Sequence, residues 1–405
     1  MSNKTQLESN NKSLDDLFTK INEITTTIST FPDREDIDYE LNINGMIKEY
    51  QVLAGENINA GDFIEFVVNY TKTIDTQYKP FDSNFNGYYI DCHSRASCVL
   101  LEPNKVFIAH ASSQYAFLHA TVVVINGTNI TVNSKRLNTT QYNCYYAPNC
   151  VLLDSNKVFI ITTDKNRESY ATLVQIENMN FTYSQPVSLL AAKTISEYSP
   201  KCLRLDSNKV FLAHQYGNHY LYGTIVTISG TISNPSMKVT TTQLNSDQFS
   251  CYIPVLDCIL LENNKVFIAH SYSYHAANQY LYGTIVTIHE EMLMATTNSL
   301  ITSSSCVQHG ISCVLLAPNK VFITYSHSTD ELLGAAIVQI NGVSASVVSQ
   351  QVLDETAYSC SEQPNCVLVQ DNIVFISHSY GEYDKYLYGT VVTIDGLNIR
   401  SITES

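Results

Sequence analysis

One phrase of seven residues occurs six times in this chain, and it restricts the available folds more than any other feature. Two copies read NKVFIAH, and the other four differ from them at one or two positions. The six copies occupy residues 104–110, 156–162, 208–214, 264–270, 319–325 and 372–378. Self-similarity at a nearly fixed period is the signature of a repeat architecture, so the chain is an array of similar units.

Each unit contains the pattern of four β-strands. A cysteine opens an apolar run such as VLL, a short turn such as EPNK follows, and the repeated phrase comes next. A polar loop then leads to TIVTI or a relative, a second turn and one more strand. β-Branched and aromatic runs between Asn, Gly and Pro turns predict strands. The repeated phrase is continuously apolar, which predicts that both faces of its strand are buried.

Sheets with two buried faces must stack against one another. The opening cysteines lie 52 to 56 residues apart. Four strands at this period predict an all-β fold, a closed six-bladed β-propeller of four-stranded blades over residues 81–405. An open stack of small sheets is the alternative, but it would leave two large apolar faces in water.

The repeat also predicts which face of the propeller carries function. We expect the first strand of each blade to run along the central axis. The short and nearly uniform EPNK-type turns, which join the first and second strands, then form one face of the propeller. The loops after the repeated phrase form the other face; they vary in length and are rich in Tyr, His, Asn and Gly. Variable loops on a fixed scaffold often carry function, and these side chains suit adaptable recognition, for example of sugars. The candidate ligand-binding residues are Tyr216, His219, Tyr220, Tyr272, Tyr274, His275, Tyr380 and Tyr383.

Two other sets of repeated residues predict structural roles. Three tyrosines recur in the YLYGT phrase, and we expect them to pack within their blades: Tyr222, Tyr282 and Tyr388. Four histidines recur at the end of the repeated phrase: His110, His214, His270 and His378. A ring of histidines could bind a metal, but we favour a hydrogen bond inside each blade. We therefore predict no metal site and no cofactor.

The 11 cysteines follow the repeat as well. Five units carry a pair, at 92/98, 144/150, 251/258, 306/313 and 360/366, whereas the third unit has Cys202 alone. The spacing within a pair is longer than the Cys-x2–4-Cys of zinc sites. Two interpretations stay open: a disulfide that pins the loop before the first strand, or buried thiols that act as small apolar residues.

Charge and motifs exclude several functions. The chain has 38 acidic and 23 basic residues, a net charge of −15 and no basic stripe, so we expect neither nucleic acid nor an anionic membrane as a partner. No apolar run approaches the roughly 18 residues of a membrane span, and the polar N-terminus lacks the apolar core of a signal peptide. We find no nucleophile elbow, P-loop, HExxH or Asp-box motif, so we do not predict an enzyme.

Residues 1–80 do not repeat. We expect a helical oligomerisation arm over 1–36 and a small β region over 37–80, with a turn at Gly61-Asp62. Ser13 can cap a helix and Pro32 can end it. Apolar residues between them are spaced alternately by three and four, as in a short coiled coil: Leu14, Leu17, Ile21, Ile24, Ile28 and Phe31. Isoleucine at both core positions disfavours a two-stranded coiled coil and favours three or four strands. We predict a homotrimer; the alternative is an amphipathic helix packed on its own chain.

The segment AGENINAGDFIEFV at 54–67 resembles segments of structural proteins from tailed bacteriophages of Gram-positive bacteria, clostridia especially. The opening KTQLESNNKSLDDL at 4–17 resembles the start of such virion proteins. The resemblance covers the first 80 residues. It implies an oligomeric fibre, appendage or decoration of the virion, made in the host cytoplasm and joined to other virion proteins through its N-terminal region. We therefore expect a phage appendage whose propeller binds a host-surface ligand, with glycan as the expected chemistry; a purely structural head or tail decoration protein is the alternative, and a glycan-degrading enzyme is a third.

Overall fold

The structure is a computed structural model. It describes residues 37–43, 46–52, 96–111, 117–127, 129–138, 144–190, 200–215, 220–246, 256–273, 279–302, 306–327, 332–353, 360, 363–380 and 386–402. The chain divides into two compact units, Met1–Tyr78 and Lys79–Ser405.

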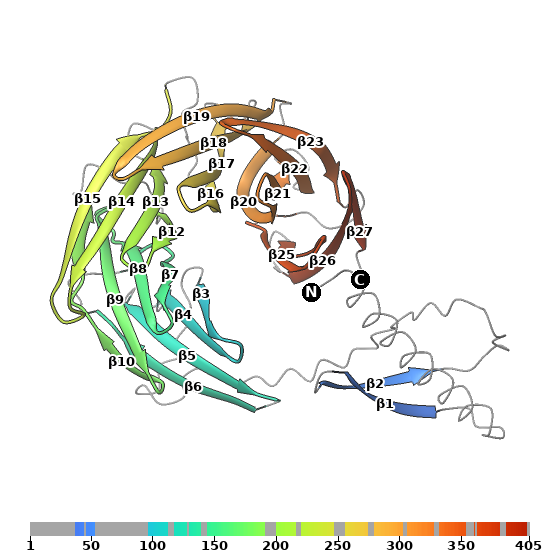
Figure 1. Ribbon diagram of the computed structural model, residues 1–405, viewed down its shortest axis with the longest axis horizontal. Helices are drawn as coiled ribbons and strands as arrows, with labels where there is room; N and C mark the ends of the chain where they lie inside the picture. Colours follow the sequence, from blue (N-terminus) through green and yellow to red (C-terminus); the bar gives the residue numbers. More distant parts are fainter. Residues whose placement is uncertain are drawn as a thin grey trace, which may run out of the picture. The chain divides into compact units, whose positions relative to one another are not determined.

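The second unit contains six antiparallel sheets, each built from one continuous stretch of chain (Figure 1). Blade 1 contains β3 (Ser97–Glu102), β4 (Lys105–Ala111), β5 (Leu118–Asn126) and β6 (Asn129–Arg136). Blade 2 contains β7 (Asn149–Asp154), β8 (Lys157–Thr163), β9 (Ser169–Glu177), β10 (Asn180–Tyr183) and β11 (Val187–Leu190). Blade 3 contains β12 (Lys201–Asp206), β13 (Lys209–Gln215), β14 (Leu221–Gly230) and β15 (Pro235–Gln243). Blade 4 contains β16 (Leu256–Glu262), β17 (Lys265–Ser273), β18 (Gln279–His289) and β19 (Met292–Ile301). Blade 5 contains β20 (Cys306–Ala317), β21 (Lys320–His327), β22 (Leu333–Asn341) and β23 (Ser344–Val352). Blade 6 contains β24 (Asn365–Gln370), β25 (Ile373–Tyr380), β26 (Tyr386–Asp395) and β27 (Asn398–Ile402).

The prediction of an all-β, six-bladed propeller of four-stranded blades is confirmed. The repeated phrase forms the second strand of every blade, as expected. Blade 2 adds a short fifth strand, because β11 pairs with β9 beyond the end of β10. The first strands of successive blades contact one another from β3 through β24, so they lie innermost around the common axis (Figure 1).

The second strand explains why its sequence is apolar on both sides. Phe159 and Ile161 of β8 pack against Val210 and Leu212 of the next blade. Val158, which alternates with them, packs toward the preceding blade. Successive side chains of a strand point to opposite faces, so one phrase supplies half of two interfaces.

The face formed by the turns between first and second strands is the same in every blade. An asparagine carbonyl in this turn accepts a hydrogen bond from the backbone N–H of an isoleucine in the third strand, at 2.8 to 2.9 Å. The acceptors are Asn104, Asn156, Asn208, Asn264, Asn319 and Asn372. One sequence signal therefore fixes six turns in one geometry.

The junction between blade 6 and blade 1 differs from the other five. Five buried apolar clusters join blades 1 to 6 in sequence. Among the described residues, none of these clusters joins blade 6 to blade 1. Phe375 of β25 is 37% exposed, whereas its counterparts in the other blades are fully buried. The six blades are confirmed, but the packing that a closed ring requires at its last junction is not present in this part of the chain.

The first unit contains a hairpin. Strands β1 (Ile37–Ile43) and β2 (Met46–Val52) pair antiparallel, with Ile43 opposite Met46. The dipeptide Asn44-Gly45 between them is a strong hairpin signal, and the prediction of a small β region with a turn at Gly61-Asp62 overlooks it. The expected helix with its six seam residues and the expected turn at Gly61-Asp62 lie outside the described residues. Within the described part of the chain, no helix is long and apolar enough to cross a membrane.

Candidate ligand-binding face

Antiparallel pairing brings two kinds of segment to one face of the propeller. In blade 3, Lys201 at the start of β12 pairs with Ala213 near the end of β13. Gln215 ends β13 opposite Leu221 of β14. The start of each first strand therefore lies beside the loop between the second and third strands. We call this side the loop face and the opposite side the turn face.

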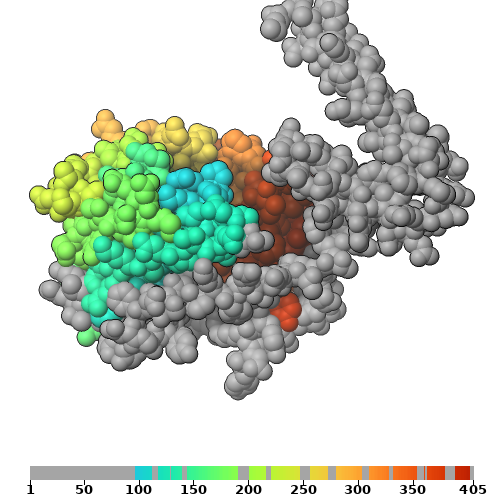
Figure 2. All heavy atoms as spheres, turned by 90° about the horizontal axis from the view of Figure 1, so that it is seen from below, coloured from blue at the N-terminus to red at the C-terminus, as the bar shows by residue number. Residues whose placement is uncertain are grey.

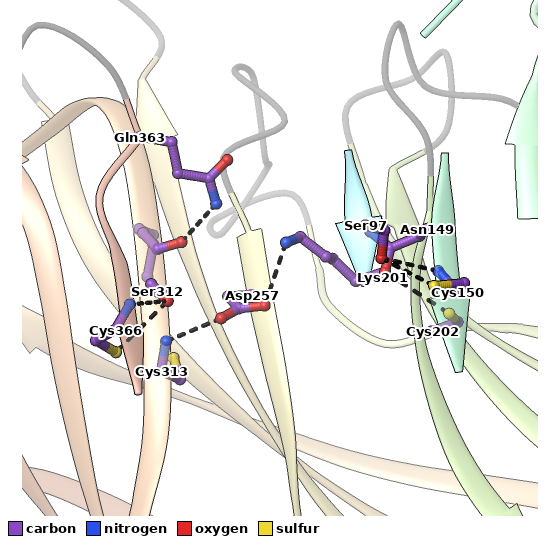
Figure 3. A network of polar contacts seen from close by, with 11 residues as sticks. Ser97, Asn149, Cys150, Lys201, Cys202, Asp257, Ser312, Cys313, Gln363 and Cys366 are labelled. Carbon is purple, nitrogen blue, oxygen red and sulfur yellow. Dashed lines mark hydrogen bonds and ion pairs between the residues drawn. The ribbon is translucent and has the colours of Figure 1, made fainter. Parts of the chain in front are cut away.

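Six polar side chains occupy equivalent positions at the start of the first strands on the loop face. Each stands immediately before the cysteine that opens the strand. The six, which we call the axial ring, are Ser97, Asn149, Lys201, Asp257, Ser312 and Asn365. Because the first strands lie innermost, this ring surrounds the axis, and Figure 3 shows five of its members.

Three members of the axial ring each accept a backbone hydrogen bond from the following blade. The backbone N–H of Cys150 donates to Ser97 Oγ at 3.1 Å, and the N–H of Cys366 donates to Ser312 Oγ at 3.1 Å (Figure 3). In blade 4, Asp257 Oδ2 accepts from the N–H of Cys313 at 2.8 Å. These N–H groups lie on the inner edge of the sheet, where no further strand can pair with them. The ring thus satisfies inner-edge donors that burial would otherwise leave unpaired.

Two charged residues distinguish one sector of the axial ring. Lys201 Nζ lies 3.5 Å from Asp257 Oδ1, and the two side chains are 28% and 17% exposed. The other four members of the ring are hydroxyls and amides, which can both donate and accept hydrogen bonds. The ring is therefore polar all round, with one cation and one anion side by side.

Blade 2 shows how a loop of this face is held. Asp164 is 5% exposed, and its Oδ1 accepts from the backbone N–H groups of Asn166 and Glu168, both at 2.9 Å. Arg167 takes a left-handed conformation, with φ of 67°. A single aspartate therefore sets the shape of this loop by local hydrogen bonds. The loops of blades 3, 4 and 6 carry tyrosines, whereas this loop carries Lys165, Asn166, Arg167 and Glu168.

The structure places three of the eight predicted ligand-binding residues at the loop face. Tyr220 is half-buried and directly precedes β14. The backbone of Tyr272 pairs with Tyr280 at the end of β17, and that of Tyr380 pairs with Tyr386 at the end of β25. The other five lie outside the described residues: Tyr216, His219, Tyr274, His275 and Tyr383.

The predicted structural roles of the repeated histidines and tyrosines agree with their contacts. His214 Nε2 lies 2.8 Å from Thr224 Oγ1 in the same blade, and the ring stacks on Tyr222 at 5.9 Å. His270 repeats the arrangement with Thr284 at 2.9 Å and Tyr282 at 5.8 Å. His378 stacks on Tyr388 in the same way. Among the described residues, no group of three or more His, Cys, Asp or Glu side chains could hold a metal ion.

Eight cysteines are thiols: Cys98, Cys144, Cys150, Cys202, Cys258, Cys313, Cys360 and Cys366. Cys144 and Cys150 form no disulfide, and neither do Cys360 and Cys366; for these two pairs the thiol interpretation holds. Burial raises the pKa of Cys150 and Cys366 to about 12. It also raises the pKa values of Cys202, Cys258 and Cys313 well above the ordinary range. Such thiols pack as small apolar side chains.

The axial ring was not among the predicted site residues. Its signal is a position that is polar in every repeat but differs in kind from blade to blade, directly before the repeated cysteine. A search for identical residues passes over such a position.

No protein-family model and no curated protein sequence matches the chain. A solved structure described as a putative 6-phosphogluconolactonase from Bacteroides fragilis is similar, with a TM-score of 0.52 and 9% identity over 76% of this chain and 82% of that chain. AofleA from Arthrobotrys oligospora has a TM-score of 0.47 at 8% identity over 76% of this chain and 86% of its own. A hypothetical selenium-binding protein from Sulfolobus tokodaii has a TM-score of 0.49 at 8% identity, over 74% of each chain. At these identities the likeness concerns the fold alone.

Proposed function

We propose that this protein is an appendage of a bacteriophage virion and that its propeller binds a host-surface glycan through the loop face. The observation that carries the proposal is the contrast between the two faces. The turn face repeats one hydrogen bond six times, at 2.8 to 2.9 Å. The loop face changes its side chains from blade to blade. Repetition on one side and variation on the other is what a rigid scaffold for a recognition surface requires.

The chemistry of the loop face supports a polyhydroxylated ligand. The axial ring offers hydroxyls, amides and one ion pair, which are groups that hydrogen-bond sugar hydroxyls. Tyr145 lies on the same face above the end of β8, where its N–H donates to the carbonyl of Thr163 at 3.0 Å, and its side chain is 51% exposed. An exposed aromatic ring beside polar groups is suited to stacking on the apolar face of a sugar.

The virion context rests on the N-terminal resemblance. On this proposal residues 1–36 join three copies, residues 37–80 attach to other virion proteins, and the propellers face the host. Glycan binding without hydrolysis matches the absence of a recognised catalytic motif in the sequence. A decoration protein without a ligand would share the N-terminal region, so binding separates the two.

Purified protein mixed with cell-wall material from a clostridial host should bind saturably. Replacing Tyr274, His275 and Tyr383 with Ala should weaken a monovalent site about a hundredfold, because each stacked ring contributes on the order of 1 kcal/mol. Binding is measured twice: with the isolated propeller unit as a monomer, which gives the affinity of a single site, and with the full chain.

The matched control carries two substitutions on the turn face, Val343→Ala and Leu397→Ala, whose side chains are 52% and 49% exposed. This variant should bind like the parent protein. Absence of saturable binding by the parent would favour the decoration protein, and release of sugar fragments would favour the enzyme. Equal binding by the triple variant would place the ligand on another surface.

A further inference from the structure

Blades 1 and 6 each carry an exposed apolar face, and these two faces hold half of the exposed large apolar side chains among the described residues. Six of the twelve such side chains belong to them: Leu100, Ile125, Val367, Val369, Phe375 and Val391. Leu100 and Ile125 lie on the face of blade 1 that corresponds to the rear face of blade 2. The other four lie on the face of blade 6 that corresponds to the leading face of blade 5.

The two faces carry apolar residues at the positions that pack in the five other interfaces, and two of these residues match closely. Phe375 occupies the position of Phe107, Phe159, Phe211, Phe267 and Phe322, which are all 0% exposed, yet it is 37% exposed itself. Ile125 is 42% exposed, although its counterparts Ile176, Ile228, Ile288, Ile340 and Ile394 are between 2% and 7% exposed. Each face is thus one half of an interface that the chain builds five times.

The residues for one more polar tie are also present at this junction. We use this name for the hydrogen bond from a cysteine N–H to the axial-ring residue of the preceding blade. Ser97, Asp257 and Ser312 each accept a hydrogen bond from a cysteine N–H in the following blade. Asn365 has the equivalent position in blade 6 and is exposed, and the cysteine that would face it, Cys98, is exposed as well. The cysteines at four of the other five positions are buried.

Among the strands that the structure describes, none is shared between the two end blades. Strands β3 to β6 complete blade 1 and β24 to β27 complete blade 6. The sheets follow one another in sequence around the axis, which brings blade 6 round toward blade 1. Figure 1 shows the two blades apart across this junction, and Figure 2 shows both from below. The chain joins consecutive blades at the other five junctions. At this one no described segment joins the two blades, so the interface can open without moving a connecting segment that the structure describes.

We infer that blade 6 latches onto blade 1 of the same chain through side chains alone, with Phe375 packed beside Leu100 and Ile125, and Asn365 accepting from the N–H of Cys98. The occupant of each face is the other face of the same molecule, because the pair continues a series of five interfaces with matching residues. Tethering within one chain also favours this closure over pairing with a second copy at low concentration. The structure describes the latch open, and closure buries both faces.

Cysteine cross-linking tests the latch. In packed interfaces the equivalent atoms lie close together: Ser97 Oγ is 3.4 Å from Cys150 Sγ, and Ser312 Oγ is 3.5 Å from Cys366 Sγ. The substitution Asn365→Cys should therefore place a sulfur within reach of Cys98 when the latch closes. Mild oxidation of the full chain should join Cys98 to the thiol introduced at position 365 by a disulfide within one chain. Tandem mass spectrometry of non-reduced peptides assigns this latch disulfide, and a denaturing gel shows a single-chain mass.

The matched control is Ser97→Cys, which should cross-link to Cys150 across a packed interface under the same conditions. Adding Phe375→Asp to Asn365→Cys should lower the yield of the latch disulfide at least tenfold, because a carboxylate opposes burial of the apolar faces. A cross-link between two chains would assign the faces to a second copy and overturn the inference. The inference would also be overturned if the latch disulfide did not form under conditions in which the control cross-links fully. An unchanged yield in the variant that also carries Phe375→Asp would overturn it as well.

Discussion

The buried histidines show how one side chain can stabilise a blade and make it sensitive to pH. His214 and His270 hold their threonine partners at 2.8 and 2.9 Å, and both rings are almost completely buried. Burial lowers the pKa of His214 to about 4 and that of His270 to about 3. Both imidazoles therefore stay neutral in the folded protein at mildly acidic pH.

Acid should consequently destabilise the propeller before most carboxylates titrate. An unfolded histidine takes up a proton near pH 6.5, so between that pH and about 4 the unfolded state binds more protons than the folded state does. Stability is full above pH 6.5 and falls as the pH drops through this window, by up to about 1.4 kcal/mol per pH unit for each histidine. Urea unfolding at about pH 7.5 and about pH 5 measures the slope.

The control for this prediction is His270→Gln, which keeps a hydrogen-bonding group but cannot titrate in this range. The free energy of unfolding of this variant should fall less steeply between the two pH values. The difference from the parent should equal the contribution of one histidine. Identical slopes for the variant and the parent would show that His270 does not drive the pH dependence.

At the residue scale the sequence predicts what is repeated and misses what varies. The hydrogen-bonding role of His214 and the packing role of Tyr222 follow from their recurrence, since a blade that is copied keeps its internal contacts. Lys201 and Asp257 could not be paired in advance, because their contact joins two different repeats near the axis. Only the fold shows that positions 56 residues apart along the chain are neighbours.

Among the elements, the inner strands depend on the polar tie. Asp257 accepts the N–H of Cys313 at 2.8 Å and pairs with Lys201. Asp257→Ala should lower the free energy of unfolding by about 1–3 kcal/mol, because a buried donor loses its acceptor. Asp257→Asn keeps an acceptor oxygen and should therefore lose less of this free energy. Ser312→Ala removes the equivalent hydrogen bond to Cys366, where no charge is involved. Equal stability of Asp257→Ala and the parent in urea unfolding would contradict a stabilising role for the tie.

The first strands also predict how the cysteines react. Cys150, Cys202, Cys258 and Cys313 are buried thiols with raised pKa values, so an alkylating reagent near pH 8 should modify them only when the protein unfolds. A reductant should leave the melting temperature unchanged. Peptide mapping after alkylation and a thermal melt with and without dithiothreitol check both points; a melting temperature lowered by reductant would restore the disulfide interpretation.

The elements themselves were predictable wherever the repeat governs them. The four strands of each blade and the burial of both faces of the second strand follow from the apolar phrase. The fifth strand β11 belongs to one repeat only, and the hairpin β1–β2 lies outside the repeat, so neither could be found by comparing units. The exposed junction of blades 1 and 6 was not foreseen either, because every copy of the phrase suggests a packed neighbour on both sides.

For the whole molecule, a propeller that displays weak binding sites gains from being held in several copies. Linked sites that contact a surface together can exceed single-site affinity by roughly 10²–10⁴-fold when the geometry allows. The proposed attachment role therefore gives a reason for an oligomerisation arm at residues 1–36.

We predict a homotrimer joined through the segment 13–31, where isoleucine at both core positions of the heptad disfavours two strands. A helix this short is marginal alone, and Thr25, Thr26 and Thr27 are poor helix formers, so association must help to hold it. Light scattering on the full chain should give about three times the monomer mass of 45.3 kDa. Asp at both Ile21 and Ile24 should weaken the trimer, because it buries charge at the seam, whereas Asp at both Thr19 and Asn22, on the outer face of the helix, is the matched control off the seam. A monomer at micromolar concentration would instead assign the segment to packing on its own chain.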